Sequence, residues 1–261
     1  MKDDDKLQNM ILRLRKQYKK RTDDHGLEIG MRYLITLKNS RNIELSNFLR
    51  KMGGYALKNE KVLDVGCGIG GFLAYLQDIG IDAYGIDVEK ELISMAFTKK
   101  NILVGDAHHL PFRDETFDLI IAFDVIEHLQ NQEMAIENMT SKLRRNGRLV
   151  ILTNNRAFPF DSDTKLFFIN YLPKSLADRY LRFRRKRPDV EYDVKTPTFF
   201  TFTRLCRKSR EYKVQVKGVF TVFGYYVEKF NKLKKIAAVL ENASYRWKVL
   251  RWMQWFAPNF V

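Results

Sequence analysis

Five short apolar segments alternate with stretches of helical periodicity through the middle of the chain. A run of apolar residues without polar alternation is typical of a strand covered on both faces. The expected strands span residues 61–65, 81–88, 101–107, 117–124 and 145–152. The expected helices lie near residues 71–79, 90–98 and 131–144. Regular alternation of strand and helix predicts an α/β fold of the doubly wound type, with a mainly parallel sheet and right-handed crossovers.

The segments on either side of this region follow other patterns. Apolar residues recur at helical spacing in residues 7–20, in residues 27–37 and after Ser40. Residues 156–203 are too long for a plain strand–helix connection, and long loops with structure of their own are commonly lids or binding loops. Four units are therefore predicted: an N-terminal helical cap (1–59), a core (60–155), a substrate-covering insertion (156–203) and a segment that completes the sheet and includes an aromatic and basic helix (204–261).

A glycine-rich turn follows the first expected strand and precedes the first helix of the core. The stretch reads Asp64-Val65-Gly66-Cys67-Gly68-Ile69-Gly70. Glycine allows positive φ and close approach of a ligand, and the N-terminus of the following helix offers free N–H groups. Gly66-x-Gly68-x-x-Gly71, with Asp87 about 20 residues further on, also fits a dinucleotide fingerprint. Asp64 inside the strand and the alternating glycines favour a different ligand.

The order and spacing of these blocks over residues 60–155 resemble the class I S-adenosylmethionine (SAM) methyltransferases, in particular the broad type 11 branch. The resemblance implies a Rossmann-like fold, SAM as cofactor and S-adenosylhomocysteine as product. In this family the first acid and the glycine turn hold the aminocarboxypropyl group, the acid after the second strand binds the ribose, and the acid after the third lies near the adenine amino group. The implied cofactor-binding positions are Asp64, Gly66, Cys67, Gly68, Gly70, Asp87, Val88, Asp106, Ala107, Phe123 and Asp124.

Methyl transfer from a sulfonium requires alignment and exclusion of water, and a base only where the acceptor arrives protonated. His128, just after the fourth expected strand, is the best-placed candidate base, with Asp124 as a second catalytic candidate. The alternative is that His128 orders the loop. Asp124-x-x-Glu127-His128 also resembles the position at which ubiquinone O-methyltransferases hold a divalent ion. Many relatives with this pattern need no metal, so no metal is predicted.

Charge is distributed unevenly along the chain. The 46 basic and 31 acidic residues give a net charge of +15. Residues 60–155 hold 9 basic and 15 acidic residues, whereas residues 156–261 hold 23 basic and 9 acidic residues. An acidic core beside a strongly basic flank suggests an anionic partner, such as a phosphorylated substrate, a membrane surface or nucleic acid. The alternative is a solvated basic face.

The predicted function is SAM-dependent methylation, most simply O-methylation, of a small or lipid- or glycan-linked acceptor. An RNA methyltransferase and a non-catalytic SAM-binding protein are the alternatives. With two cysteines and no run of 18 apolar residues, we expect a cytoplasmic protein without disulfides or a spanning helix. Trp247, Trp252 and Trp255 lie among basic residues in the stretch 228–256, which suggests peripheral contact with an anionic membrane. The sequence does not identify the methyl acceptor.

Overall fold

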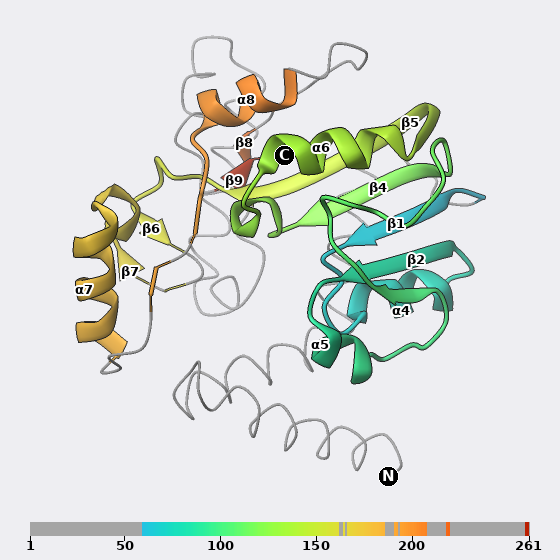
Figure 1. Cartoon of the computed structure of the whole chain (residues 1–261), viewed down its shortest axis with the longest axis horizontal. Coiled ribbons are helices and arrows are strands. Elements are labelled where there is room, and N and C mark those ends of the chain that lie inside the picture. Colours follow the sequence, from blue (N-terminus) through green and yellow to red (C-terminus); the bar gives the residue numbers. More distant parts are fainter. Residues whose placement is uncertain are drawn as a thin grey trace, which may run out of the picture.

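The computed structural model describes residues 59–161, 164, 166–185, 191–192, 194–207, 218–219 and 259–260 (Figure 1). The predicted N-terminal helices and the tryptophan-bearing stretch 228–256 lie outside these residues, so they remain predictions. Among the described helices, none combines the length and the apolar character needed to cross a bilayer.

The described strands build a seven-stranded sheet in the order β3-β2-β1-β4-β5-β9-β8. The first five strands of this order are mutually parallel, and β9 pairs antiparallel with both β5 and β8. This confirms the doubly wound, mainly parallel sheet. The strands are β1 (Lys61–Val65), β2 (Asp82–Asp87), β3 (Ile102–Val104), β4 (Phe117–Phe123), β5 (Leu143–Asn154), β8 (Gly218–Val219) and β9 (Asn259–Phe260).

The helices of the core follow the predicted alternation but differ at their ends. They are α4 (Gly71–Asp78), α5 (Lys90–Ser94), the 3-10 turn η1 (Ile126–His128) and α6 (Gln132–Ser141). The prediction of a helix at 90–98 is wrong in length, because α5 ends at Ser94. Beyond it the backbone bonds to the glycine turn instead, where the Phe97 N–H donates to the Ile69 carbonyl at 2.9 Å. The helix predicted at 131–144 also ends early, because Lys142 accepts hydrogen bonds from Thr116 and Phe117 as β5 begins.

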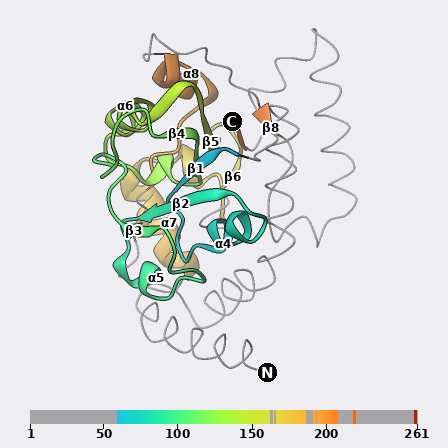
Figure 2. The ribbon, with the colours of Figure 1, turned by 90° about the vertical axis from the view of Figure 1, so that its right-hand side faces the viewer.

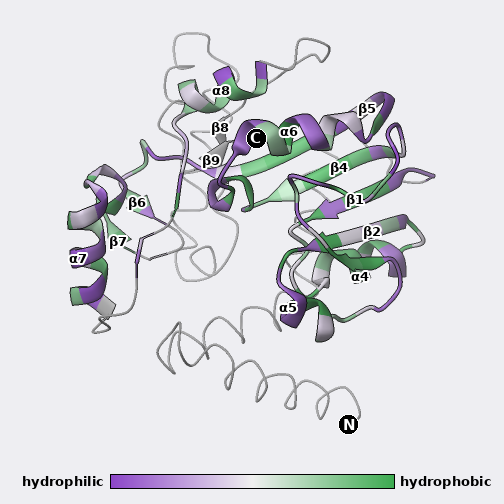
Figure 3. Cartoon of the chain, viewed as in Figure 1, coloured by the Kyte–Doolittle hydropathy of each residue, from purple (hydrophilic) through white to green (hydrophobic). Residues whose placement is uncertain are grey.

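Two apolar clusters cover the two faces of the sheet. On one face Leu63, Ile86 and Ile120 pack with residues of α6 and with Phe202 of α8 (Phe199–Arg207). On the other face Val62, Leu119 and Ile121 pack against Phe72, Leu73 and Leu76 of α4. Figure 2 shows α6 and α4 on opposite sides of the strands, and Figure 3 shows β4 as a nearly continuous apolar segment. Burial on both faces explains why these strands have apolar runs rather than alternation.

The insertion is a smaller unit at the end of the sheet where β5 stops (Figure 1). It contains the hairpin β6 (Phe160–Asp161) and β7 (Leu166–Phe167), the 3-10 turn η2 (Ile169–Tyr171) and α7 (Lys174–Arg185). Among its described residues, four buried ones form its apolar cluster: Leu166, Ile169, Ala177 and Leu181. Beyond α7 the chain returns through residues 194–198 to α8. Pro173 directly precedes α7, a place that suits proline because the first N–H groups of a helix need no partner within it.

Candidate active site

The carboxyl ends of the parallel strands meet along one edge of the sheet. From β1 the chain order runs outward to β2 and β3 on one side and to β4 and β5 on the other. Such a reversal opens a crevice beyond the strand ends, where ligands of doubly wound proteins bind. Three of the four predicted acids lie there just past their strands or at a strand's last residue: Asp87, Asp106 and Asp124. The fourth, Asp64, lies inside β1 next to its end.

The glycine turn after β1 is shaped by contacts with the neighbouring strand ends. The N–H groups of Gly66 and Cys67 both donate to the Ile86 carbonyl, at 2.8 and 3.1 Å. Gly66 has φ +74°, and a Cβ added there would lie 2.2 Å from Cγ2 of Val125, which follows β4. A side chain at Gly66 is therefore excluded twice, by backbone conformation and by packing.

Gly68 differs from Gly66 in that its vacant side faces open space. Its φ is +54°, and no atom of the described residues lies within 4 Å of the position of an added Cβ. Its N–H donates to Oδ2 of Asp87 at 2.8 Å, and the N–H of Glu89 donates to Oδ1 of the same carboxylate at 2.9 Å. A carboxylate has about four acceptor positions, so two remain for a ligand. This arrangement fits a vicinal diol, such as the two hydroxyls of a ribose, lying over Gly68.

Negative charge dominates the electrostatics of the turn. Burial raises the pKa of the Cys67 thiol, and the negative charges of Asp64 and Asp87 raise it further. Asp64 is itself 6% exposed. Acids near the turn suit a ligand that carries positive charge, as the ammonium and sulfonium groups of SAM do. The residues present therefore fit the cofactor implied by the glycine motif.

Asp106, after β3, is held by a short polar chain. Its Oδ1 accepts from the N–H of His108 at 2.9 Å and lies 2.6 Å from His108 Nδ1. The Nε2 of the same ring accepts from the N–H of Asn131 at 3.3 Å, and Asn131 caps α6. Burial raises the pKa of Asp106, but hydrogen bonds from the backbone and side chain of His108 more than offset it and lower that pKa. His108 thus links Asp106 to α6.

The loop after β4 contains both predicted catalytic residues. Asp124 has φ +55°, an unusual conformation for a residue other than glycine, and its N–H donates to the Leu152 carbonyl at 2.9 Å. Strained backbone of this kind gathers at functional sites. His128 lies in η1 and is exposed. The structure brings both residues to the crevice edge of the sheet, and their catalytic roles remain predictions.

Glu127, between these two residues in the sequence, is fully buried. Its Oε2 accepts from the Thr153 hydroxyl at 2.9 Å, and its Oε1 accepts from the side-chain amide of Asn154 at 3.2 Å, both at the end of β5. Its main-chain carbonyl accepts from the N–H of Lys195 at 2.8 Å. Glu127 therefore joins the loop after β4 to β5 and to the insertion. Within the described part of the chain, no group of three potential metal-ligating side chains occurs.

The remaining predicted cofactor residues differ in exposure. Val88 is 68% exposed, Ala107 is buried, and the half-buried ring of Phe123 lies 6.4 Å from that of Phe72. Sequence reasoning missed the packing of Val125 on Gly66 and the linking role of His108. The D-x-H spacing is a weak signal for the second, because short-range Asp–His hydrogen bonds need few intervening residues. No sequence signal exists for the first, which joins two different strand ends.

Comparison with known proteins decides the family. A methyltransferase-domain family matches residues 38–203 of the chain. The chain belongs to the SAM-dependent methyltransferases of class I. SAM is the cofactor of this family, in accordance with the glycine turn and the acids described above. The type 11 branch within the family stays a prediction.

The chain aligns with only part of the length of the curated relatives that it matches. The chain is 34% identical over 106 residues to norajmaline N-methyltransferase of Rauvolfia serpentina, covering 37% of this chain and 36% of that protein. It is 31% identical over 147 residues to a ubiquinone biosynthesis O-methyltransferase of Rickettsia typhi, covering 53% and 58%. A SAM-dependent methyltransferase from Archaeoglobus fulgidus has a similar solved structure, with a TM-score of 0.48, 18% identity, and coverage of 86% of this chain and 94% of that chain.

Proposed function

We propose that the protein transfers a methyl group from SAM to a small or lipid- or glycan-linked acceptor, and that the acceptor atom is an oxygen. The observation that supports methyl transfer most directly is the crevice over Gly68, where Asp87 keeps free acceptor positions beside an open glycine turn. In the proposed arrangement Asp64 and the glycine turn hold the aminocarboxypropyl group, Asp87 the ribose and Asp106 the adenine edge. When bound, SAM supplies an electrophilic methyl group.

The cofactor proposal is tested by calorimetry with SAM and S-adenosylhomocysteine. Replacing Asp87 by Ala should raise the dissociation constant about tenfold or more, since hydrogen bonds to a charged group contribute about 1.5–3 kcal/mol. Asp82→Ala is the matched control, because Asp82 is exposed at the opposite end of the same strand. Equal affinities in the Asp87 variant and the control would remove Asp87 from the site.

His128 is proposed as the general base that takes a proton from a hydroxyl acceptor. It is supported by its exposed position just past β4, next to the strained Asp124. His128→Ala should lower kcat at least about tenfold, at the low end of general-base effects, with little change in SAM affinity. The exposed His109 provides the control, His109→Ala. Full turnover in the His128 variant would leave His128 as a loop-ordering residue.

The acceptor is tested with a panel of hydroxylated lipids, glycan intermediates, quinols and RNA, with release of S-adenosylhomocysteine as the readout. Names of relatives include both N- and O-methyltransferases, so amines belong in the panel. Methylation of RNA alone would favour the RNA methyltransferase alternative. Tight SAM binding with no transfer to any acceptor class would favour a non-catalytic SAM-binding protein.

A further inference from the structure

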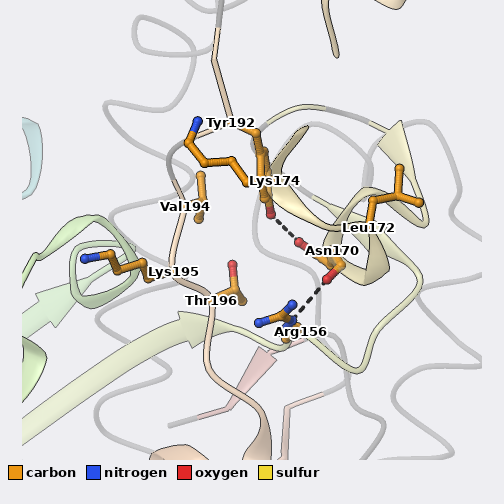
Figure 4. Close-up of a pocket in the computed structure, with 8 residues that line it drawn as sticks. All are labelled: Arg156, Asn170, Leu172, Lys174, Tyr192, Val194, Lys195 and Thr196. Carbon is orange, nitrogen blue, oxygen red and sulfur yellow. Dashed lines mark hydrogen bonds between the residues drawn. The ribbon is translucent and has the colours of Figure 1, made fainter. Parts of the chain in front are cut away.

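The insertion contains a half-open cavity of about 190 Å³. Every residue that lines it comes from the predicted substrate-covering unit, residues 156–203. Three of them, Leu172, Val194 and the ring of Tyr192, offer apolar surface, and none of the lining side chains is acidic. Figure 4 shows the lining residues: Arg156, Asn170, Leu172, Lys174, Tyr192, Val194, Lys195 and Thr196.

The buried hydroxyl of Thr196 is the first indication that this cavity binds a ligand. The residue is 5% exposed, and its Oγ1 is buried with no hydrogen-bond partner among the described residues. Buried hydroxyls are normally paired, because an unsatisfied one loses its hydration without compensation. In Figure 4 the hydroxyl points into the open space among the lining residues, between Val194 and Asn170. A ligand acceptor atom there would supply the missing bond.

Asn170 and Arg156 add further donors to the same space. Asn170 is 4% exposed, and its Oδ1 already accepts from the Tyr192 hydroxyl, so the amide N–H groups are the part of this side chain that can still donate to a ligand. Arg156 uses only Nε within the described structure, in a 3.0 Å bond to the Asn170 carbonyl. That bond fixes the guanidinium while its terminal nitrogens stay available for a ligand. The donors are therefore a hydroxyl, an amide and a guanidinium, which together suit an oxyanion.

Positive charge at the cavity is only partly neutralised. Lys174 pairs with Asp178 and Glu191. By contrast, neither Arg156 nor Lys195 has an acidic partner within the described ranges of the chain. The Lys195 side chain extends away from Thr196 in Figure 4, and its Nζ lies 3.3 Å from the Gln130 carbonyl. Lys195 thus adds positive potential at the rim rather than a direct contact.

Hydrogen bonds connect the wall of the cavity to the predicted active-site loop. Arg156 lies two residues past the end of β5, and its N–H donates to the Pro197 carbonyl at 2.9 Å. The side-chain amide of Gln132 donates to the carbonyls of both Ile126 and Lys195, at 2.9 Å each. With the Lys195–Glu127 bond, these contacts hold the cavity wall against the loop that contains Asp124 and His128. A molecule anchored in the cavity would lie beside the loop after β4, at the β4–β5 side of the crevice.

We propose that this cavity binds an oxyanionic group of the methyl acceptor, a phosphate ester or a carboxylate, and so anchors the acceptor beside the cofactor. This inference rests on the proposed methyl transfer and names the acceptor's anchoring group. The apolar side of the cavity receives the part of the acceptor next to the anion. The basic excess of the chain beyond residue 155 attracts such a substrate.

The test is calorimetric titration of the full chain, with and without S-adenosylhomocysteine, using phenyl phosphate, benzoate and uncharged benzyl alcohol as probes. Phenyl phosphate or benzoate should bind at least about tenfold more tightly than benzyl alcohol, because the guanidinium forms charge-assisted bonds only with the anions. Which anion binds more tightly identifies the source of the oxyanion. Arg156→Gln should abolish most of that preference, whereas the exposed Arg113→Gln, before the amino end of β4, should leave it unchanged.

Thr196→Val gives a second and independent readout. Valine has nearly the same shape but no hydroxyl, so the variant should weaken binding of the anionic probe at least about threefold. Because it also removes an unsatisfied buried group, the ligand-free variant should be at least as stable to urea as the parent chain. If the Thr196 hydroxyl had only a structural role, its removal would not both preserve the stability of the ligand-free chain and weaken binding of the anion.

Several results would overturn the proposal. They are equal binding of benzyl alcohol and the anions, no binding of any probe, or anion binding that survives both Arg156→Gln and Thr196→Val. Affinity for S-adenosylhomocysteine is measured for each variant and should not change. If the parent chain does not bind S-adenosylhomocysteine, the proposed function is refuted. If it binds this cofactor product but shows no preference for anions, only the anchoring site is refuted.

Discussion

The Rossmann-like core and the insertion are built by different means. The core packs large apolar clusters on both faces of a parallel sheet, and Phe117, Leu63 and Ile120 are fully buried. Among its described residues, the apolar cluster of the insertion has four buried members, and buried polar groups accompany them, among them Asp161, Asn170 and Thr196. Figure 3 shows the difference, with apolar strands in the core and a largely polar α7. Most of the apolar burial among the described residues therefore lies in the first unit, and the candidate acceptor-binding surface lies in the second.

This division has a physical reason. Burial of apolar surface is non-directional and gives the core its cooperative stability. Buried polar groups contribute little net stability but fix donors and charges in defined positions. A surface that recognises a polar substrate needs the second property more than the first.

The largest effect is expected from truncation in the core. Phe117 is fully buried, and its ring meets those of Phe112 and Tyr84 at 5.0 and 5.7 Å. Phe117→Ala should lower the free energy of unfolding by about 3–5 kcal/mol, measured by urea denaturation followed by circular dichroism. If the core and insertion differ as described, Leu181→Ala should instead leave the main transition nearly unchanged and speed hydrogen exchange in α7.

Phe183 is the control for that comparison. It lies on the same helix as Leu181 but is 79% exposed, so Phe183→Ala should alter neither measurement. Equal shifts of the main transition in the Phe117 and Leu181 variants would mean that the two units unfold as one.

The next effect separates structure from ligand binding within the glycine turn. Gly66→Ala places a methyl group against Val125 in a left-handed backbone, and should cost about 2–5 kcal/mol of stability. Gly68→Ala meets the backbone penalty alone, about 1–2 kcal/mol, but places its methyl group in the proposed cofactor space. Gly66→Ala should therefore lower the urea midpoint more than Gly68→Ala does. Gly68→Ala should weaken S-adenosylhomocysteine binding more, relative to the stability that each variant loses. The same ranking in both measurements would contradict a ligand over Gly68.

The smallest effect concerns the hydrogen bonds and ion pairs that hold α7 within the insertion. Asp178 accepts from the Tyr192 N–H at 2.6 Å and pairs with Lys174, and these contacts lower its pKa against the raising effect of burial. A carboxyl group with a lowered folded-state pKa stabilises above its unfolded pKa of about 3.9, and this contribution is lost as the pH falls through the folded value.

Asp178→Asn should therefore reduce protection of α7 from hydrogen exchange by about 1 kcal/mol near neutral pH. The difference from the parent chain should shrink below about pH 4. Asp114→Asn is the matched control in the core, because Asp114 pairs with Lys142 on the exposed surface and should not change α7. A difference that does not vary with pH would exclude the charge of Asp178 as the cause.

The sequence predicted the core well and the insertion only in outline. Apolar runs, helical spacing and the turn from Asp64 to Gly70 reflect local requirements of strands, helices and positive φ, so they can be read along the chain. Helix ends were less accurate, since α5 stops where Phe97 bonds to Ile69, a contact between distant segments. For the site, residue types and strand ends were predictable, while the partners of Asp87 and Asp106 were not.

What the sequence determined by itself is the order of strands and helices, the glycine turn with its acids, and the contrast between an acidic core and a basic flank. These follow from periodicity, backbone preference and charge, which are properties of neighbouring residues. Only the tertiary structure decided that Val125 closes on Gly66, that Glu127 faces β5, and that Thr196 and Arg156 meet around one cavity. Those placements depend on packing between segments tens of residues apart, for which no local pattern in the chain is required.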